Sequence, residues 1–147
     1  MIRKLWFLAW LLCLGAAPRA SAQRFVALGM PDSEVLAALQ KFQKAVAAGD
    51  RATVAGMANY PVRVNRGPDQ HMLLADRAEF LQHYEAVFTP DVKRAVASTR
   101  LTEVLGGIDG VPLGRGIVWL TSTCSSERPR RCRLGLSSVN LGKNSNK

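Results

Sequence analysis

The sequence has few residues of the kinds that bind metal ions. It contains three cysteines and two histidines, and His71 and His83 lie far in sequence from the late cysteines. No His-x-x-Glu-His or related zinc spacing is present. A glycine-rich phosphate loop is also missing, because neither Gly106-Gly107 nor Gly114-x-Gly116 precedes an expected helix. The sequence therefore predicts neither a zinc enzyme nor a nucleotide-phosphate site, and we expect no cofactor.

The chain is also short of long apolar runs, apart from one at its start. Two basic residues precede an uncharged apolar stretch from Leu5 to Ala17. About 13 apolar residues are too few to span a bilayer as a helix. The small residues of Ala20-Ser21-Ala22 then suit cleavage before Gln23. We predict that residues 1–22 are a secretory signal peptide, and that the mature protein is periplasmic or secreted and has no transmembrane anchor.

Removal of this leader changes both the charge and the cysteine count. The 20 basic residues become 17 while all 11 acidic residues remain, so the mature net charge is +6. Cys13 is lost with the leader, and the bulky Leu12 before it argues against lipid attachment there. Only Cys124 and Cys132 remain, and an oxidising compartment allows them one intramolecular pairing. We predict a disulfide across a hairpin tip, against the alternatives of two free thiols or a metal pair.

The first half of the mature chain has the pattern of helices around a short hairpin. Apolar residues recur at helical spacing from Val35 to Val46, and Asp76 with Glu79 fits a helix-start cap. Val62-Arg63-Val64-Asn65 alternates as a half-buried strand does. The expected elements are a flexible segment 23–31, a helix capped by Asp32 or Ser33 and ending at Gly49, a short helix from Asp50 to before Tyr60, strands 62–65 and 71–74 around a turn at 66–69, and a helix from Asp76 to Phe88 that Pro90 either ends or extends over 92–96.

The second half is expected to form an antiparallel sheet. Repeated glycines at 106–110 suit a tight hairpin between strands 101–105 and 111–121. A second hairpin is expected to join 117–123 to 133–141 across the cysteine pair. A frayed tail over 143–147 then follows a single domain over 32–142. The expected fold class is α+β, with about three N-terminal helices packed on a curved, mostly antiparallel sheet.

Four segments of the chain carry a resemblance to a known family. They are Asn59-Tyr60-Pro61-Val62-Arg63-Val64, Arg77-Ala78-Glu79-Phe80-Leu81-Gln82-His83-Tyr84 with Val87-Phe88-Thr89-Pro90, Leu113-Gly114-Arg115-Gly116-Ile117-Val118-Trp119, and the late cysteine pair. With the element order, they resemble the nuclear-transport-factor-2-like (SnoaL-like) superfamily, and in particular small exported bacterial members of uncharacterised function. The resemblance implies a cone-shaped fold with a cavity, and homodimers formed through the sheets. Such relatives usually end on an apolar strand, whereas residues 133–139 are rich in glycine and serine, so we expect a weakly paired last strand.

The chain does not supply the catalytic set of the superfamily's enzymes. Ketosteroid-isomerase-like proteins use an aspartate base with a tyrosine and a protonated acid. Here Asp76 is better explained as a helix cap, Asp109 as a turn residue and Tyr60 as the wall of a Tyr-Pro corner. His83 and Tyr84 point about 100° apart on one helix, so we expect them not to converge.

Two sets of residues remain candidates for binding. The residues that could line a cavity are Tyr60, Arg63, Tyr84, Arg115 and Trp119. Trp119 is also typical of a core anchor, and strand alternation favours solvent for both arginines, since a buried charge would need an anionic partner. The second set is a basic cluster at the expected hairpin tip, formed by Arg128, Arg130, Arg131 and Arg133. This cluster is suited to bind anionic lipid headgroups or polysaccharide; the alternative is a solvated basic loop with no partner. Because no aromatic residue interleaves the arginines, we do not expect nucleic acid as a partner.

These observations lead to three functional hypotheses. The first is an exported, non-catalytic binding or accessory domain that uses a conical cavity for a small ligand or its sheet face for an envelope protein. The alternative is a small enzyme of isomerase, dehydratase or hydrolase type with His83, Tyr84 or Tyr60 in the cavity. The third is an envelope-surface binder that uses the basic hairpin over Arg128–Arg133.

Overall fold

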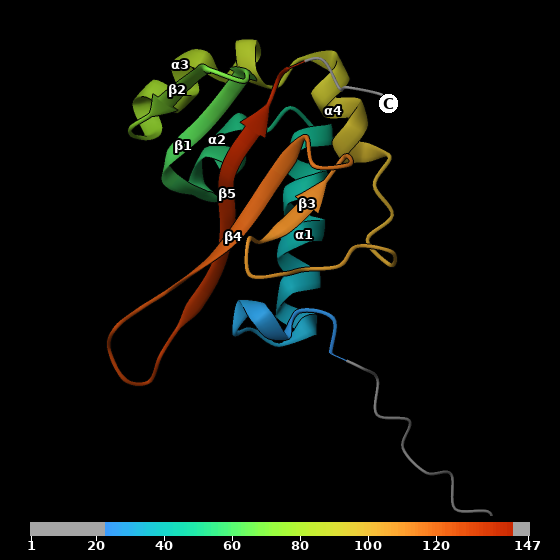
Figure 1. Cartoon of the computed structure of the whole chain (residues 1–147), viewed down its shortest axis with the longest axis vertical. Coiled ribbons are helices and arrows are strands. Elements are labelled where there is room, and N and C mark those ends of the chain that lie inside the picture. The colour runs from blue at the N-terminus through green and yellow to red at the C-terminus, as the bar shows by residue number, and fades with distance from the viewer. Residues whose placement is uncertain (1–22, 143–147) are drawn as a thin grey trace, which may run out of the picture.

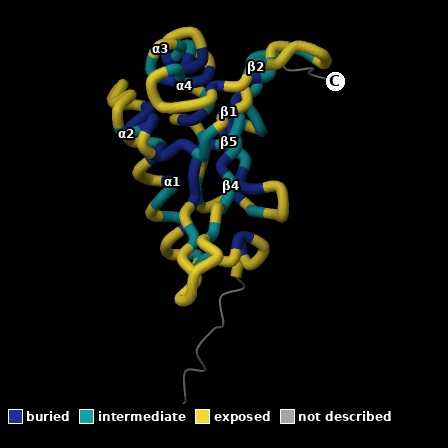
Figure 2. Tube along the Cα trace, turned by 90° about the vertical axis from the view of Figure 1, so that its left-hand side faces the viewer, coloured by how far each residue is buried: buried dark blue, intermediate teal, exposed yellow. Residues whose placement is uncertain are grey.

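The computed structural model describes residues 23–142, and within them four α-helices pack on a five-stranded mixed sheet (Figure 1). The helices lie on one face of the sheet and leave most of the other face uncovered, as two roughly perpendicular views show (Figures 1 and 2). The elements are the 3-10 helix η1 (Val26–Leu28), α1 (Asp32–Ala47), α2 (Arg51–Gly56), β1 (Ala58–Gly67), β2 (Gln70–Leu74), α3 (Arg77–Val87), α4 (Pro90–Ala97), β3 (Val111–Leu113), β4 (Val118–Cys124) and β5 (Cys132–Asn140). The expected α+β class is confirmed.

Side-chain caps fix where α2, α3 and α4 begin. The Asp50 carboxylate accepts a hydrogen bond from the Thr53 amide at 3.1 Å, and the Asp76 carboxylate accepts one from the Glu79 amide at 2.9 Å. Thr89 caps α4, so the helix expected as an extension after Pro90 forms. Both aspartates therefore satisfy amide groups that a helix start leaves free.

The segment before α1 is tied down by Asp32 and Arg24. The Asp32 carboxylate accepts hydrogen bonds from the amides of Arg24, at 2.9 Å, and Phe25, at 3.1 Å. The Arg24 guanidinium donates to the carbonyl oxygens of Leu101, at 3.2 Å, and Thr102, at 2.6 Å. Phe25 is completely buried. We expected a flexible segment and a cap at Asp32 or Ser33; instead, the residue before Asp32 occupies the cap position and the Asp32 carboxylate holds η1 against the core.

The sheet has the order β2-β1-β5-β4-β3, in which β1 and β5 are parallel and the other neighbours antiparallel. The hairpin expected across the cysteine pair is confirmed as β4–β5. The last strand, expected to pair weakly, lies in the centre of the sheet. Its Gly135 is needed there, because a Cβ would lie 2.4 Å from the Oδ1 of Asn59 and 2.8 Å from the carbonyl oxygen of Met57.

The hairpin predicted between residues 101–105 and 111–121 does not form. Residues 101–103 form turns and residues 104–105 have no regular structure, so no strand forms there, and Gly107 and Gly110 make only an isolated bridge. The expected strand 111–121 is split into β3 and β4, which pair with each other. The split occurs because Gly114, Arg115 and Gly116 take left-handed conformations, with φ of 59°, 58° and 85°.

Aromatic side chains fill the core between the two layers. Phe42, Phe80, Tyr84 and Phe88 are completely buried. Tyr84 and Phe88 are stacked with ring centroids 4.9 Å apart, and Phe80 lies edge-on to both at 6.0 Å and 6.2 Å. Rings at these distances make direct contact. The space between α3 and the neighbouring helices is therefore packed with side chains.

Candidate binding surfaces

The structure places the five candidate cavity residues in different surroundings. Tyr84 is completely buried in the aromatic cluster, and Tyr60 lies at its edge, 6.1 Å from the Phe80 ring. Arg63 and Arg115 are exposed, as strand alternation suggested for Arg63. Trp119 is half-buried on β4. The tyrosines thus belong with the core, while the other three lie at or near the surface.

The residues considered for catalysis are already engaged elsewhere or lie apart. The Tyr60 hydroxyl donates to the carbonyl oxygen of Ala55 at 2.8 Å, and the Nδ1 of His83 lies 2.9 Å from the carbonyl oxygen of Glu79 on its own helix. The Tyr84 hydroxyl is buried without a hydrogen-bond partner among the described residues. Burial raises the pKa of both phenols above the ordinary value. No hydrogen bond joins His83 to either tyrosine in residues 23–142, so these side chains form no acid-base relay.

The two aspartates considered for catalysis have structural positions. Asp76 caps α3, as expected, and Asp109 is exposed in the turn between Gly107 and Gly110. Asp50, which the sequence assigned only a capping role, accepts bonds from both the hydroxyl and the amide of Thr53. These bonds, chiefly the one from the hydroxyl, hold the pKa of Asp50 below its usual value.

Arg115 lies beside an open hollow of about 560 Å³ between the end of α4 and the β3–β4 turn. Arg100, Val104 and Pro112 also line it. Arg100 is paired with Glu103 at 3.3 Å, so one of the two positive charges in the hollow is already compensated. Of the five candidate cavity residues, Arg115 alone contributes to this hollow.

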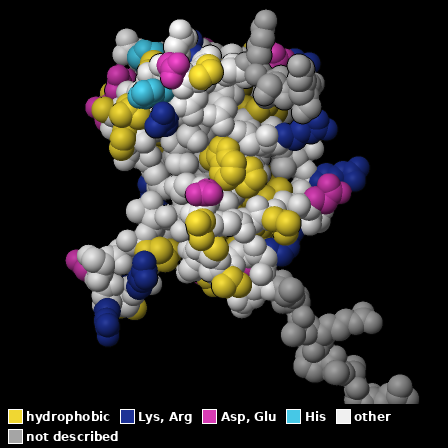
Figure 3. Space-filling model, viewed as in Figure 1, with side chains coloured by type: hydrophobic (Ala, Val, Ile, Leu, Met, Phe, Trp, Pro, Cys, Tyr) yellow, Lys and Arg dark blue, Asp and Glu magenta, His cyan; other side chains and the backbone are white. Residues whose placement is uncertain are grey.

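A row of side chains crosses the uncovered face of the sheet. Leu73, Arg63, Ser138, Trp119 and Pro112 lie opposite one another on β2, β1, β5, β4 and β3. We call these five residues the outer row. Leu73 is 52% exposed, and Trp119 and Pro112 are half-buried. Figure 3, which views this face, shows hydrophobic side chains gathered over β3 and β4.

Local hydrogen bonds fix the position of Trp119 within the outer row. Its indole nitrogen donates to the carbonyl oxygen of Gly116 at 3.0 Å. The Asn140 amide group donates to the same oxygen at 2.7 Å, and the Ser137 hydroxyl donates to the carbonyl oxygen of Trp119 at 3.1 Å. Trp119 is therefore a half-buried aromatic residue whose indole is held by a local hydrogen bond, rather than the core anchor that its apolar strand suggested. Sequence patterns do not show this, because it depends on the turn at Gly116.

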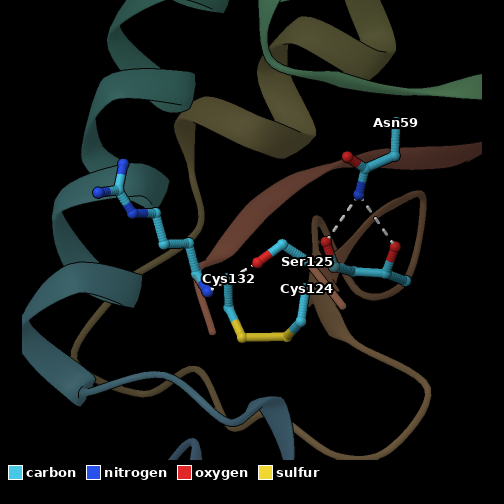
Figure 4. The surroundings of a disulfide bond; sticks show 6 residues. Asn59, Cys124, Ser125 and Cys132 are labelled. Carbon is cyan, nitrogen blue, oxygen red and sulfur yellow. Dashed lines mark hydrogen bonds between the residues drawn. A yellow bond between two sulfur atoms is a disulfide. The ribbon is translucent and has the colours of Figure 1, made fainter. Parts of the chain in front are cut away.

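The β4–β5 hairpin carries the basic cluster away from the body of the protein (Figure 1). The expected disulfide joins Cys124 and Cys132 at the base of its loop (Figure 4). Arg128, Arg130 and Arg131 are exposed in the loop. The fourth predicted member, Arg133, donates to a carbonyl oxygen of β1 at 2.7 Å. Its guanidinium therefore joins β5 to β1, which leaves three arginines at the tip.

The positive charge is concentrated in two hairpins of the sheet, β1–β2 and β4–β5. Residues 58–74 and 118–140 contain six arginines and two acidic residues, Asp69 and Glu127. The rest of residues 23–142 contains nine basic and nine acidic residues. The whole surplus of four positive charges in the described chain thus lies in β1–β2 and β4–β5 with their loops. Such segregation favours an anionic partner for these two hairpins.

Comparison with protein-family models, curated proteins and solved structures finds no match for this chain. Within residues 23–142, no group of three or more histidine, cysteine or acidic side chains is placed to hold a metal ion. None of the described helices has the length and apolar character needed to cross a bilayer. The outer row and the loop of the β4–β5 hairpin are the candidate binding surfaces of the described residues.

Proposed function

We propose that this protein is an exported, non-catalytic binding domain of the nuclear-transport-factor-2-like superfamily, and that its uncovered sheet face binds a protein partner. The outer row carries this proposal, because it places Trp119 and Arg63 on either side of Ser138, on a face that no described helix covers. Tryptophan and arginine are among the residues that most often dominate binding energy at protein interfaces. The buried aromatic cluster favours this face over the interior as the binding surface.

The order of elements supports the superfamily assignment. A long helix and a short helix precede the first hairpin, α3 and α4 follow it, and three strands end the described part of the chain. The segments that carry the resemblance form the start of β1, α3 with the start of α4, and the β3–β4 hairpin. Residues 1–22 lie outside the described residues, and their role as a signal peptide is part of the proposal. The Cys124–Cys132 disulfide suits the oxidising compartment that such a leader would reach.

The charge of the sheet indicates the chemistry of the partner. The five strands contain Arg63, Arg66 and Arg133, and no acidic residue. Two copies packed face to face would bring like charges together, which disfavours a homodimer through this face. We therefore propose a different protein that presents apolar side chains together with an aspartate or glutamate opposite Arg63.

A photo-crosslinking residue at Ser138, between Arg63 and Trp119, tests this proposal in cells that produce the protein. We expect a crosslinked product with a different protein from position 138, and none from the same residue placed at exposed Gln40 on α1. Arg63→Glu should abolish the product, whereas Arg51→Glu on α2 should leave it unchanged. A product that survives Arg63→Glu, or one that contains only a second copy of this chain, would contradict the proposal.

A further inference from the structure

The loop of the β4–β5 hairpin has a composition suited to contact with anions. We call residues 125–131 the basic tip; their sequence is Ser-Ser-Glu-Arg-Pro-Arg-Arg, and all seven are exposed. The basic tip has no aromatic residue and, apart from Pro129, no apolar one. It extends beyond the body of the protein, and Figure 3 shows basic side chains at its end. Any binding by this element would rest on charge and hydrogen bonds.

The base of the basic tip is held in a fixed conformation. The Cys124–Cys132 disulfide joins its two strands. Next to it, the Ser125 amide donates to the carbonyl oxygen of Arg131 at 2.8 Å, and the Arg131 amide donates to the Ser125 hydroxyl oxygen at 3.0 Å. Figure 4 shows Ser125 beside the disulfide. Because the loop is closed before it binds anything, less conformational freedom is lost when its arginines engage an anion.

No acidic side chain of the described residues forms an ion pair with the arginines of the basic tip. The three ion pairs of the described chain all lie outside the β4–β5 hairpin. Glu34 lines a hollow of about 390 Å³ together with Arg130 and Arg131, but it forms no ion pair with either. Free guanidinium groups bind phosphate oxygens through two parallel hydrogen bonds. The tip therefore presents three guanidinium groups that form no ion pair with the described residues.

We propose that the basic tip binds the phosphate headgroups of an anionic lipid bilayer. The hairpin extends past the body of the described chain, so its loop can contact a flat surface without the rest of the molecule. Residues 118–140 contain four arginines and one acidic residue, whereas the rest of residues 23–142 contains 11 basic and 10 acidic residues, so most of the electrostatic attraction is directed through the β4–β5 hairpin. With no bulky apolar side chain to insert, the tip stays at headgroup level. This inference goes beyond the proposed function, because it does not involve the outer row.

Vesicle binding by the full chain tests the inference. The probes are vesicles of phosphatidylcholine containing phosphatidylglycerol, with pure phosphatidylcholine as the neutral reference. The tip variant is Arg128→Gln, Arg130→Gln and Arg131→Gln; the matched control, Lys41→Gln, Lys44→Gln and Arg51→Gln, removes the same charge from α1 and α2. We expect binding to the anionic vesicles to weaken steeply with added salt. The tip variant should weaken it about 100-fold, and the control by less than about 3-fold.

Three results would overturn the inference. Equal losses in the tip variant and its control would show that net charge alone drives binding. Equal binding of the unmodified protein to neutral and anionic vesicles would remove the role of phosphate charge. The third result is binding to dextran sulfate that depends on the tip and persists at a salt concentration at which the vesicles are released. It would show that the tip binds an anionic polymer instead. The tip variant should unfold at the same temperature as the unmodified protein, which checks that the variant is folded.

Discussion

The amide of Gly114 donates a hydrogen bond to the hydroxyl oxygen of Thr99 at 2.8 Å, and that hydroxyl in turn donates to the carbonyl oxygen of Ala95 at 2.9 Å. The two bonds join the end of α4 to the β3–β4 turn. Gly116 lies in the same turn and accepts the hydrogen bond from the Trp119 indole. The position of Trp119 in the outer row therefore depends on a helix that lies on the other layer of the protein.

Replacing Thr99 with valine should destabilise the protein by about 1–3 kcal/mol, because the Gly114 amide would lose its acceptor in a half-buried site. Denaturant unfolding measures the change. Thr123→Val is the matched control: Thr123 is exposed and forms no side-chain hydrogen bond within the described residues, so its replacement should change stability by less than about 0.5 kcal/mol. Equal unfolding midpoints for both variants would show that the Thr99 bond contributes nothing.

Gly135→Ala should destabilise the protein by about 1–3 kcal/mol, because the added Cβ would overlap Asn59 and the backbone of Met57. Gly67→Ala, where no atom lies within 4 Å of the added carbon, is the comparison and should have a much smaller effect. Thermal unfolding of the two variants distinguishes them. If Gly135→Ala is as stable as Gly67→Ala, the approach of β1 to the centre of β5 is not as close as described.

Loss of the disulfide should lower stability. Cys124→Ser with Cys132→Ser should destabilise the protein by about 2–3 kcal/mol, because the unfolded chain regains the freedom of the open loop. Guanidinium unfolding with and without a reductant gives the measurement. The reductant should bring the unmodified protein to the level of the double variant and leave that variant unchanged. An unmodified protein indifferent to the reductant would mean that the bond does not form.

Tyr84→Phe should leave stability unchanged or raise it by up to about 1 kcal/mol at neutral pH, because the lost hydroxyl has no partner among the described residues. Burial raises the pKa of the Tyr84 phenol, so its neutral form favours folding. That contribution is complete below the ordinary pKa of about 10 and is lost as pH rises through the higher pKa of the folded protein.

Unfolding at alkaline pH, monitored by the absorbance of ionised tyrosine, measures whether stability falls with pH in this direction. The unmodified protein should lose more stability than Tyr84→Phe as the pH rises above about 10. Tyr60 is present in both proteins and its pKa is also raised by burial, so its contribution cancels in the comparison. If both proteins lose the same amount of stability with rising pH, the Tyr84 hydroxyl is in contact with solvent and the expectation is wrong.

The features predicted from sequence are those whose partners lie close along the chain. The cap formed by Asp76 and the Glu79 amide spans three residues, and the alternation through Val62 and Val64 is a property of one strand. The disulfide and the basic tip were likewise predicted because Cys124 and Cys132 enclose the arginines in a short loop. Local patterns were sufficient in each case.

The errors concern residues whose partners are distant in sequence. Residues 101–105 have a strand-like composition, but the guanidinium of Arg24, nearly 80 positions away, occupies carbonyl oxygens that a neighbouring strand would use. The last strand, which was expected to pair weakly, lies in the centre of the sheet because Gly135 has no side chain to block the close approach of the start of β1. The outer row depends on the register of five strands, and composition carries no information about register.

The contacts of Arg24 and Asp32 also bear on the proposed removal of residues 1–22. A leader cut before Gln23 would leave Arg24 as the second residue of the mature chain. A peptidase that cut two residues later would remove the guanidinium that holds the carbonyl oxygens of Leu101 and Thr102, together with one of the amides that Asp32 binds. Uneven leader cleavage would thus yield two mature forms of one protein that differ in stability, although they differ in length by only two residues.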